Sequence, residues 1–110
     1  MKLPNRDGAY IPRDKIIAYL LSPTHPVGRL KAHFFRSIGF DTSDITELEG
    51  QFLRIAHNED VIAQIISPYG IKFIVDGVLE RKGEAVAQIR TIWIIDAGGN
   101  YPRFVTAYPL

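Results

Sequence analysis

The sequence predicts an α+β fold, with three N-terminal helices followed by a four-stranded antiparallel β-meander. Apolar residues recur with the 3.6-residue period of helices in the first half of the chain, and they alternate from about residue 60 onward. Three short turn sequences, SPYG, RKGE and AGGN, divide the second half into four β-rich runs. Turns this short join antiparallel neighbours, so a meander is the simplest arrangement.

Length and composition indicate one domain covering residues 1–110. The chain has 46% hydrophobic and 23% charged residues, as an ordinary globular protein does. It contains no cysteine, which excludes disulfides, thiolate nucleophiles and cysteine-ligated zinc. No apolar run approaches the roughly 20 residues needed to span a bilayer, and the start, MKLPNRDGAY, lacks the apolar stretch of a secretory signal. We therefore expect a cytoplasmic protein without a membrane partner.

The three helices are expected over residues 12–21, over residues 28–38 and within residues 41–58. Pro12 suits the first turn of a helix, and Gly39 suits a left-handed cap over which Phe40 closes. Thr42 or Ser43 is the expected N-cap of the third helix. The apolar stripes of the three helices comprise Ile16, Ile17, Leu20 and Leu21, then Leu30, Phe34, Phe35 and Ile38, then Ile45, Leu48, Phe52, Ile55 and Ala56.

The four strands are expected over residues 60–67, 71–79, 85–95 and 101–108. The face predicted to pack on the helices carries Ile71, Phe73, Val75, Leu79, Ala87, Ile89, Thr91, Trp93 and Ile95. The opposite face carries Lys72, Asp76, Gln88 and Arg90, mixed with Ile74 and Ile92. The faces of Arg103 and Thr106 stay open, because a one-residue bulge would exchange them.

Several polar residues are candidates for chemistry. Lys31 falls within the apolar arc of the second helix, where it either extends past the core edge to water or stabilises an anion at a cleft. The last strand brings Arg103, Thr106 and Tyr108 together, beside a strand with Arg90 and Thr91. This donor set can hold a phosphate, although Thr and Tyr are also good strand residues.

The sequence predicts neither a metal site nor a nucleotide-binding loop. The spacing of His25, His33 and His57 matches no common metal-ligand pattern, and the glycines form no phosphate loop. His25, between two prolines, is the histidine retained as a candidate acid or base. No cofactor is expected.

The segments YLLSPTHPVGRLKAHFF, SPYGIKFIVDG, RTIWII and PRFVTAYP resemble a family of small bacterial domains of unknown function. The order of elements is also similar to the barnase, EndoU, colicin and RelE superfamily of ribonuclease toxins. That second resemblance implies metal-independent RNA cleavage, in which the ribose 2′-hydroxyl attacks the adjacent phosphate. It also implies a small immunity or antitoxin protein as partner.

Carried over to this chain, the resemblance nominates Lys31, Thr91, Arg103, Thr106 and Tyr108 as candidate catalytic residues. Trp93 also matches the shared pattern, but its expected face makes it a packing residue. His25 belongs to a segment that the divergent toxin-like relatives lack. The competing hypothesis is a non-enzymatic module that binds a partner through its sheet face or its acidic third helix.

Overall fold

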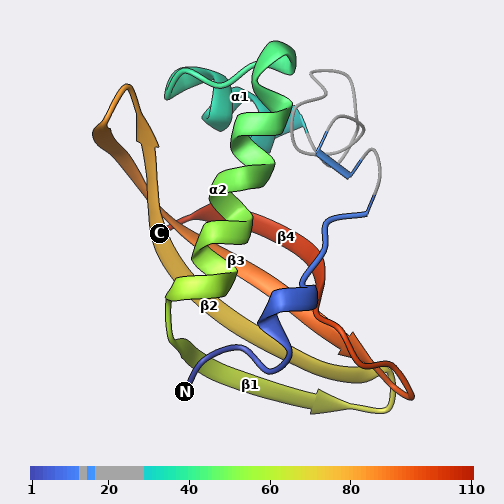
Figure 1. Cartoon of the computed structure of the whole chain (residues 1–110). Coiled ribbons are helices and arrows are strands. Elements are labelled where there is room, and N and C mark those ends of the chain that lie inside the picture. Colours follow the sequence, from blue (N-terminus) through green and yellow to red (C-terminus); the bar gives the residue numbers. More distant parts are fainter. Residues whose placement is uncertain (13–14, 17–28) are drawn as a thin grey trace.

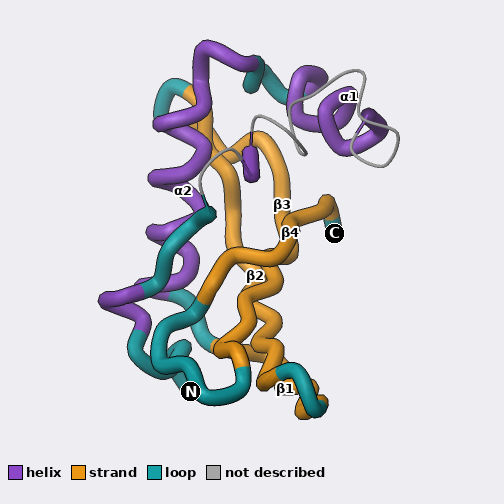
Figure 2. Tube along the Cα trace, turned by 90° about the vertical axis from the view of Figure 1, so that its right-hand side faces the viewer, coloured by secondary structure: helices purple, strands orange, loops and turns teal. Residues whose placement is uncertain are grey.

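The computed structural model describes residues 1–12, 15–16 and 29–110. Within these ranges two α-helices, α1 (Arg29–Ser37) and α2 (Ile45–Asn58), precede a four-stranded sheet. The strands are β1 (Val61–Ser67), β2 (Gly70–Arg81), β3 (Glu84–Asp96) and β4 (Arg103–Pro109). Helix α2 lies across one face of the sheet, and α1 lies at one end, displaced toward the other side (Figure 1 and Figure 2).

The expectation of three N-terminal helices is wrong, although the α+β class holds. The described residues contain two α-helices and two short 3₁₀ turns, Arg6–Gly8 and Thr42–Asp44. The expected helix over residues 12–21 lies mostly outside the described residues. The segment before it forms bridges at both edges of the sheet, where Lys2 pairs with Asp60 and Tyr10 pairs with Arg103. Such long-range pairing leaves no periodic signal in the sequence.

The predicted meander is confirmed. The strands are antiparallel and follow the order β1-β2-β3-β4. Lys82 and Gly83 join β2 to β3, and both have positive φ, 53° and 79°. This is the backbone form of the two-residue turns that match the right-handed twist of paired strands. The local turn chemistry therefore specifies the central hairpin.

The predicted inner face, which packs on α2, is also confirmed. Phe73, Val75, Ile89 and Trp93 are buried there, as is Thr91. Aromatic rings continue the core from one element to the next. The Phe35 ring of α1 packs on Phe52 of α2, Phe52 stacks on Phe104 of β4, and Phe104 meets Trp93 of β3, with centroids 6.2, 5.0 and 5.4 Å apart. This series of ring contacts holds α1 against the rest of the fold.

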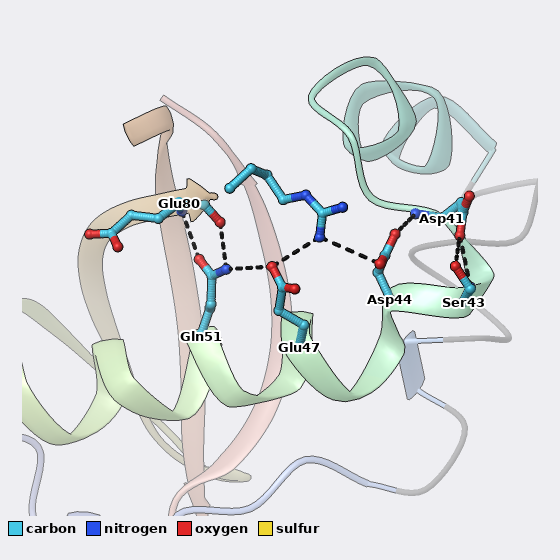
Figure 3. Close-up of polar contacts among 7 residues, drawn as sticks. Asp41, Ser43, Asp44, Glu47, Gln51 and Glu80 are labelled. Carbon is cyan, nitrogen blue, oxygen red and sulfur yellow. Dashed lines mark hydrogen bonds and ion pairs between the residues drawn. The ribbon is translucent and has the colours of Figure 1, made fainter. Parts of the chain in front are cut away.

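Short local signals set the ends of the two helices. Gly39 has φ 104° and the Phe40 N–H donates to Phe35 O, so the predicted cap of α1 is confirmed. The predicted N-cap of the next helical segment is wrong. Asp41, rather than Thr42 or Ser43, accepts from the Ser43 N–H at 2.8 Å, and the Asp41 N–H donates to Asp44 (Figure 3). These reciprocal bonds to the Asp41 and Asp44 carboxylates begin the segment one residue earlier than predicted.

Helix α2 is fastened to the β2–β3 hairpin by polar contacts (Figure 3). The buried Gln51 amide donates to Glu80 O at 2.6 Å and accepts from Glu80 N–H at 2.7 Å. These bonds satisfy a strand residue beside the register shift between Leu79 and Glu80. Arg81 binds Glu47 at 2.9 Å and approaches Asp44 at 3.4 Å. The acidic groups at the start of α2, Asp44 and Glu47, thus form ion pairs within the fold.

Gly77 marks a close approach of α2 to β2. A Cβ added there would lie 2.6 Å from Ile55 Cγ1 and 2.9 Å from its Cδ1. We expect Gly77→Ala to lower the free energy of unfolding by about 1–3 kcal/mol, because the inserted methyl overpacks the interface. Chemical denaturation measures this loss, and in an Ile55→Ala background most of it should disappear.

Gly50 is the matched control, because it lies within α2 and an added Cβ would have no neighbour within 4 Å. Gly50→Ala should therefore raise stability by up to about 1 kcal/mol through helix propensity. Equal effects of the two glycine substitutions would contradict the packing described at Gly77.

Candidate functional site

A polar cluster lies on the outer face of the sheet, the face opposite α2. It consists of Lys31 from α1, Thr106 and Tyr108 from β4, Arg90 from β3 and Asp76 from β2, and is called the Lys31–Thr106 cluster below. The strand registers pair Asp76 with Arg90, Arg90 with Tyr108 and Ile92 with Thr106. All five side chains are half-buried. They are therefore partly held by the fold and still reachable from water.

Lys31 reaches this cluster from a helix that is separated from β4 by more than sixty residues of chain. Its Nζ donates to Thr106 Oγ1 at 2.6 Å. The neighbouring Ala32 and Phe35 are fully buried, so α1 is anchored by its apolar side while the lysine extends along the margin of the core. Lys31 and the closing strand, which the sequence nominated separately, are therefore in contact.

Arg90 supplies a second cation to the cluster. Its Nε and Nη2 donate to the two carboxylate oxygens of Asp76 at 2.9 and 3.0 Å. This two-point contact raises the pKa of Arg90 further above its ordinary value, against a smaller opposing effect of burial, and the Tyr108 hydroxyl contributes in the same direction. Asp76 thus fixes the guanidinium plane beside Tyr108.

Arg103 lies on the same face, but its guanidinium is directed elsewhere. It pairs with Ile94, one row beyond Thr106 on the side away from Arg90. Its Nε and Nη2 donate to the Asp96 carboxylate at 3.1 and 2.9 Å, near the end of β3. These bonds lower the pKa of Asp96 and raise that of Arg103. Arg103 is therefore held toward the β3–β4 connection.

Thr91 is not part of the cluster. It is fully buried on the inner face, where its hydroxyl donates to Val75 O at 2.6 Å and accepts from the Trp93 indole at 2.8 Å. Both residues are packing elements of the core, as predicted for Trp93. His25 lies outside the described residues. His33 is exposed on α1, and His57 lies in the last turn of α2, where its Nε2 is buried without a partner among the described residues.

Sequence reasoning placed Asp76 and Arg90 on the outer face but did not include them with the candidate catalytic residues. Counting back from the Arg81–Glu84 pair would set Asp76 against Ile89. The shift between Leu79 and Glu80 sets it against Arg90 instead. The available signal was an acidic and a basic residue at nearly equal distances on either side of the hairpin turn. The bulge concealed this signal because it shifts their pairing by one residue.

A groove beside α2 is another concave surface in the described part of the chain. This shallow groove of about 240 Å³ lies between α2 and β2, lined by Arg54, Ile55, Asn58, Glu59, Gly77, Val78 and Glu80. It contains none of the candidate catalytic residues.

No group of three or more His, Asp or Glu side chains suited to a metal ion occurs among the described residues. In that same part, every helix is too short or too polar to cross a bilayer.

The fold and the cluster define an α+β domain with a four-stranded meander and a donor-rich outer face. The chain belongs to the family described as "Domain of unknown function (DUF6883)", whose model matches residues 2–110. It is also similar to a chain of the contact-dependent growth inhibition toxin and immunity protein complex from Klebsiella pneumoniae 342. That likeness has a TM-score of 0.67 and 18% identity, and covers 96% of each chain. No curated protein matches the sequence.

The Arg103–Asp96 contact yields a measurable pH dependence. In Arg103→Gln the pKa of Asp96 should rise toward its ordinary value of 3.8, because the charged donor that favours the carboxylate is gone. A carboxylate whose pKa is lower in the folded state than in the unfolded state stabilises the fold at pH values above the unfolded-state pKa. This stabilisation is lost as the pH falls through the folded-state pKa. The wild type should therefore lose more stability than the variant between roughly pH 5 and pH 2.

Carboxylate titration by NMR measures this shift, and Asp41 is the internal control. Its pKa is lowered by hydrogen bonds from Ser43, so it should titrate alike in both proteins. An unchanged Asp96 titration in Arg103→Gln would refute the contact.

Proposed function

We propose that this chain is a toxin domain that cleaves RNA by metal-independent transesterification. The proposal depends mainly on one observation, the 2.6 Å hydrogen bond between Lys31 Nζ and Thr106 Oγ1. This contact brings the helix lysine to the strand that carries Tyr108 and lies beside Arg90. A lysine, a guanidinium and two hydroxyls form a set of donors suited to a phosphodiester.

Each residue of the cluster has a proposed role. Lys31 holds the phosphate as a compact cation or accepts a proton from the attacking 2′-hydroxyl. Thr106 and Tyr108 position the phosphate oxygens. Arg90 neutralises the charge that develops in the transition state, and Asp76 orients Arg90. Both arginines are paired with an aspartate, and we assign this role to Arg90 rather than Arg103 because Arg90 lies beside Tyr108, whereas Arg103 is held toward the β3–β4 connection.

The structural likeness supports the same class of protein. The similar chain belongs to a complex of a growth inhibition toxin with its immunity protein. The immunity protein is a precedent for the partner we propose, a small protein that covers the outer face and blocks RNA. The acidic helix favoured by the competing hypothesis is a weaker docking site, because Asp44 and Glu47 at its start are engaged by Arg81.

Expression of the chain alone in bacteria tests the proposal. We expect induction of the wild type to arrest growth and degrade RNA. Lys31→Ala should relieve both effects, with cleavage reduced about 100-fold or more, as is usual when an acid, base or charge-stabilising group is removed. Thr106→Val should weaken cleavage, because it removes the hydroxyl and nearly keeps the shape. Growth curves and RNA gels measure these effects, and circular dichroism checks that each variant is folded.

Lys72→Ala is the matched control. Lys72 is an exposed lysine on the outer face that pairs with Ile94 and so lies outside the cluster. The Lys72→Ala variant should keep most of the toxicity of the wild type. Normal growth with intact RNA at high expression of folded wild type would refute the proposal and favour a binding module.

The proposed chemistry also predicts the product. Purified protein should leave 2′,3′-cyclic phosphate ends on a labelled RNA, because the leaving 5′-oxygen departs as the 2′-oxygen bonds to phosphorus. Cleavage should continue in excess EDTA. Mass spectrometry identifies the ends, and the Lys31→Ala protein purified in parallel shows whether a contaminating nuclease contributes. Linear 3′-phosphates from the first time point onward, or complete loss of cleavage in EDTA, would contradict this mechanism.

A further inference from the structure

A row of three residues crosses the sheet beside Arg90. Gln88 lies two residues before Arg90 on β3 and pairs with Val78 of β2. Leu110 lies on the other side of Gln88, because the Leu110 N–H donates to Gln88 O at 3.1 Å. Ile89 is buried on the inner face, so alternation along β3 directs Gln88 to the outer face with Arg90. Val78, Gln88 and Leu110 are called the Gln88 row below.

The Gln88 row combines an amide with apolar neighbours. Gln88 is exposed, and its amide has no hydrogen-bond partner among the described residues. Val78 and Leu110 are 38% and 58% exposed. A glutamine amide carries donors and an acceptor side by side. The row therefore suits a flat group that has a polar edge and apolar faces.

The row on the opposite side of the Lys31–Thr106 cluster lacks this combination. It consists of Lys72, Ile94 and Arg103, which pair across β2, β3 and β4. Lysine and arginine offer donors without acceptors, and Arg103 already binds the carboxylate near the end of β3. Ile94 is 5% exposed and so leaves little apolar surface. The Gln88 row is therefore the better site for a group that needs both a donor and an acceptor.

We propose that Gln88 recognises a nucleobase next to the phosphate that is cleaved, with a preference for adenine. This inference rests on the proposed function, because it takes the phosphate to lie at the Lys31–Thr106 cluster. Residues two apart on a strand are separated by about 6.6 Å. One ribose spans a gap of that order between a phosphate and its base. A base attached to a phosphate at Arg90 therefore reaches Gln88.

The hydrogen-bonding groups of Gln88 select adenine. The amide forms two bonds to this base, accepting from N6–H₂ and donating to N7. Single-stranded RNA exposes these base edges, and RNA-binding proteins read them by such contacts. Val78 and Leu110 shield the amide from water on both sides, which strengthens its hydrogen bonds to a bound base.

Cleavage of an RNA pool of random sequence tests the assignment. Sequencing of the cut ends gives the base frequencies on both sides of the cut. At one of these positions the wild type should favour adenine over guanine by about fivefold or more. Gln88→Glu should reverse this preference at the same position, because a carboxylate only accepts hydrogen bonds and guanine presents two donors, N1–H and N2–H₂. Gln88→Leu should abolish the preference.

Gln64→Glu is the matched control. Gln64 is an exposed glutamine of β1 that pairs with Phe73 and so lies away from the Gln88 row. The control adds the same charge as Gln88→Glu and should leave the base preference unchanged. An unchanged preference in both Gln88 variants, or an equal change in Gln64→Glu, would overturn the assignment. Circular dichroism checks that each variant is folded.

Binding of adenosine 3′-monophosphate and guanosine 3′-monophosphate separates this inference from the proposed function, because binding needs no cleavage. Calorimetry should show that the wild type binds the adenosine compound about fivefold more tightly, and that Gln88→Glu prefers the guanosine compound. A wild type that cleaves RNA but binds both compounds equally would refute base recognition alone. Binding with the expected preference in a protein that does not cleave would refute the proposed function alone. A wild type that neither binds nor cleaves would refute both.

Discussion

The extra residue in β4 is the constraint on which the candidate site depends. Ile92 pairs with Thr106 while Trp93 pairs with Phe104, so Val105 has no partner of its own. Without this bulge, Arg103 and Thr106 would face opposite sides of the sheet, because they are three residues apart. With it, Phe104 enters the aromatic core while Thr106 turns outward. The same irregularity therefore packs the core and presents the strand hydroxyl to the lysine of α1.

A second irregularity, in the β2–β3 hairpin, positions the remaining charges. The shift beside Glu80 sets Asp76 against Arg90, and the resulting two-point ion pair lies next to Tyr108. Gln51 of α2 holds the Glu80 backbone at this point through two hydrogen bonds. The helix on one face of the sheet thus stabilises the register that arranges polar groups on the other. Core packing and site geometry depend on the same contacts.

Much of the fold was predictable because its signals are local. Alternating apolar residues and short turns gave four antiparallel strands, and glycine after the helix gave the cap at Gly39. The bridges of Lys2 and Tyr10 to the sheet were not predictable, since they join residues far apart in sequence. The candidate site was predictable in part. Lys31 stood out as a charge within an apolar arc, whereas Thr91 was nominated through resemblance and is committed to the core.

The sequence by itself determined the α+β class, the strand order, the buried face of β2 and β3, and the candidate role of Lys31. All of these follow from residue type and period within a few residues. Tertiary structure alone decided which polar side chains meet. Two one-residue bulges and the packing of Phe35 on Phe52 bring Lys31 to Thr106 and turn Arg103 toward Asp96. A bulge adds only one residue to the alternating pattern of a strand, yet it reverses the face of every side chain beyond it.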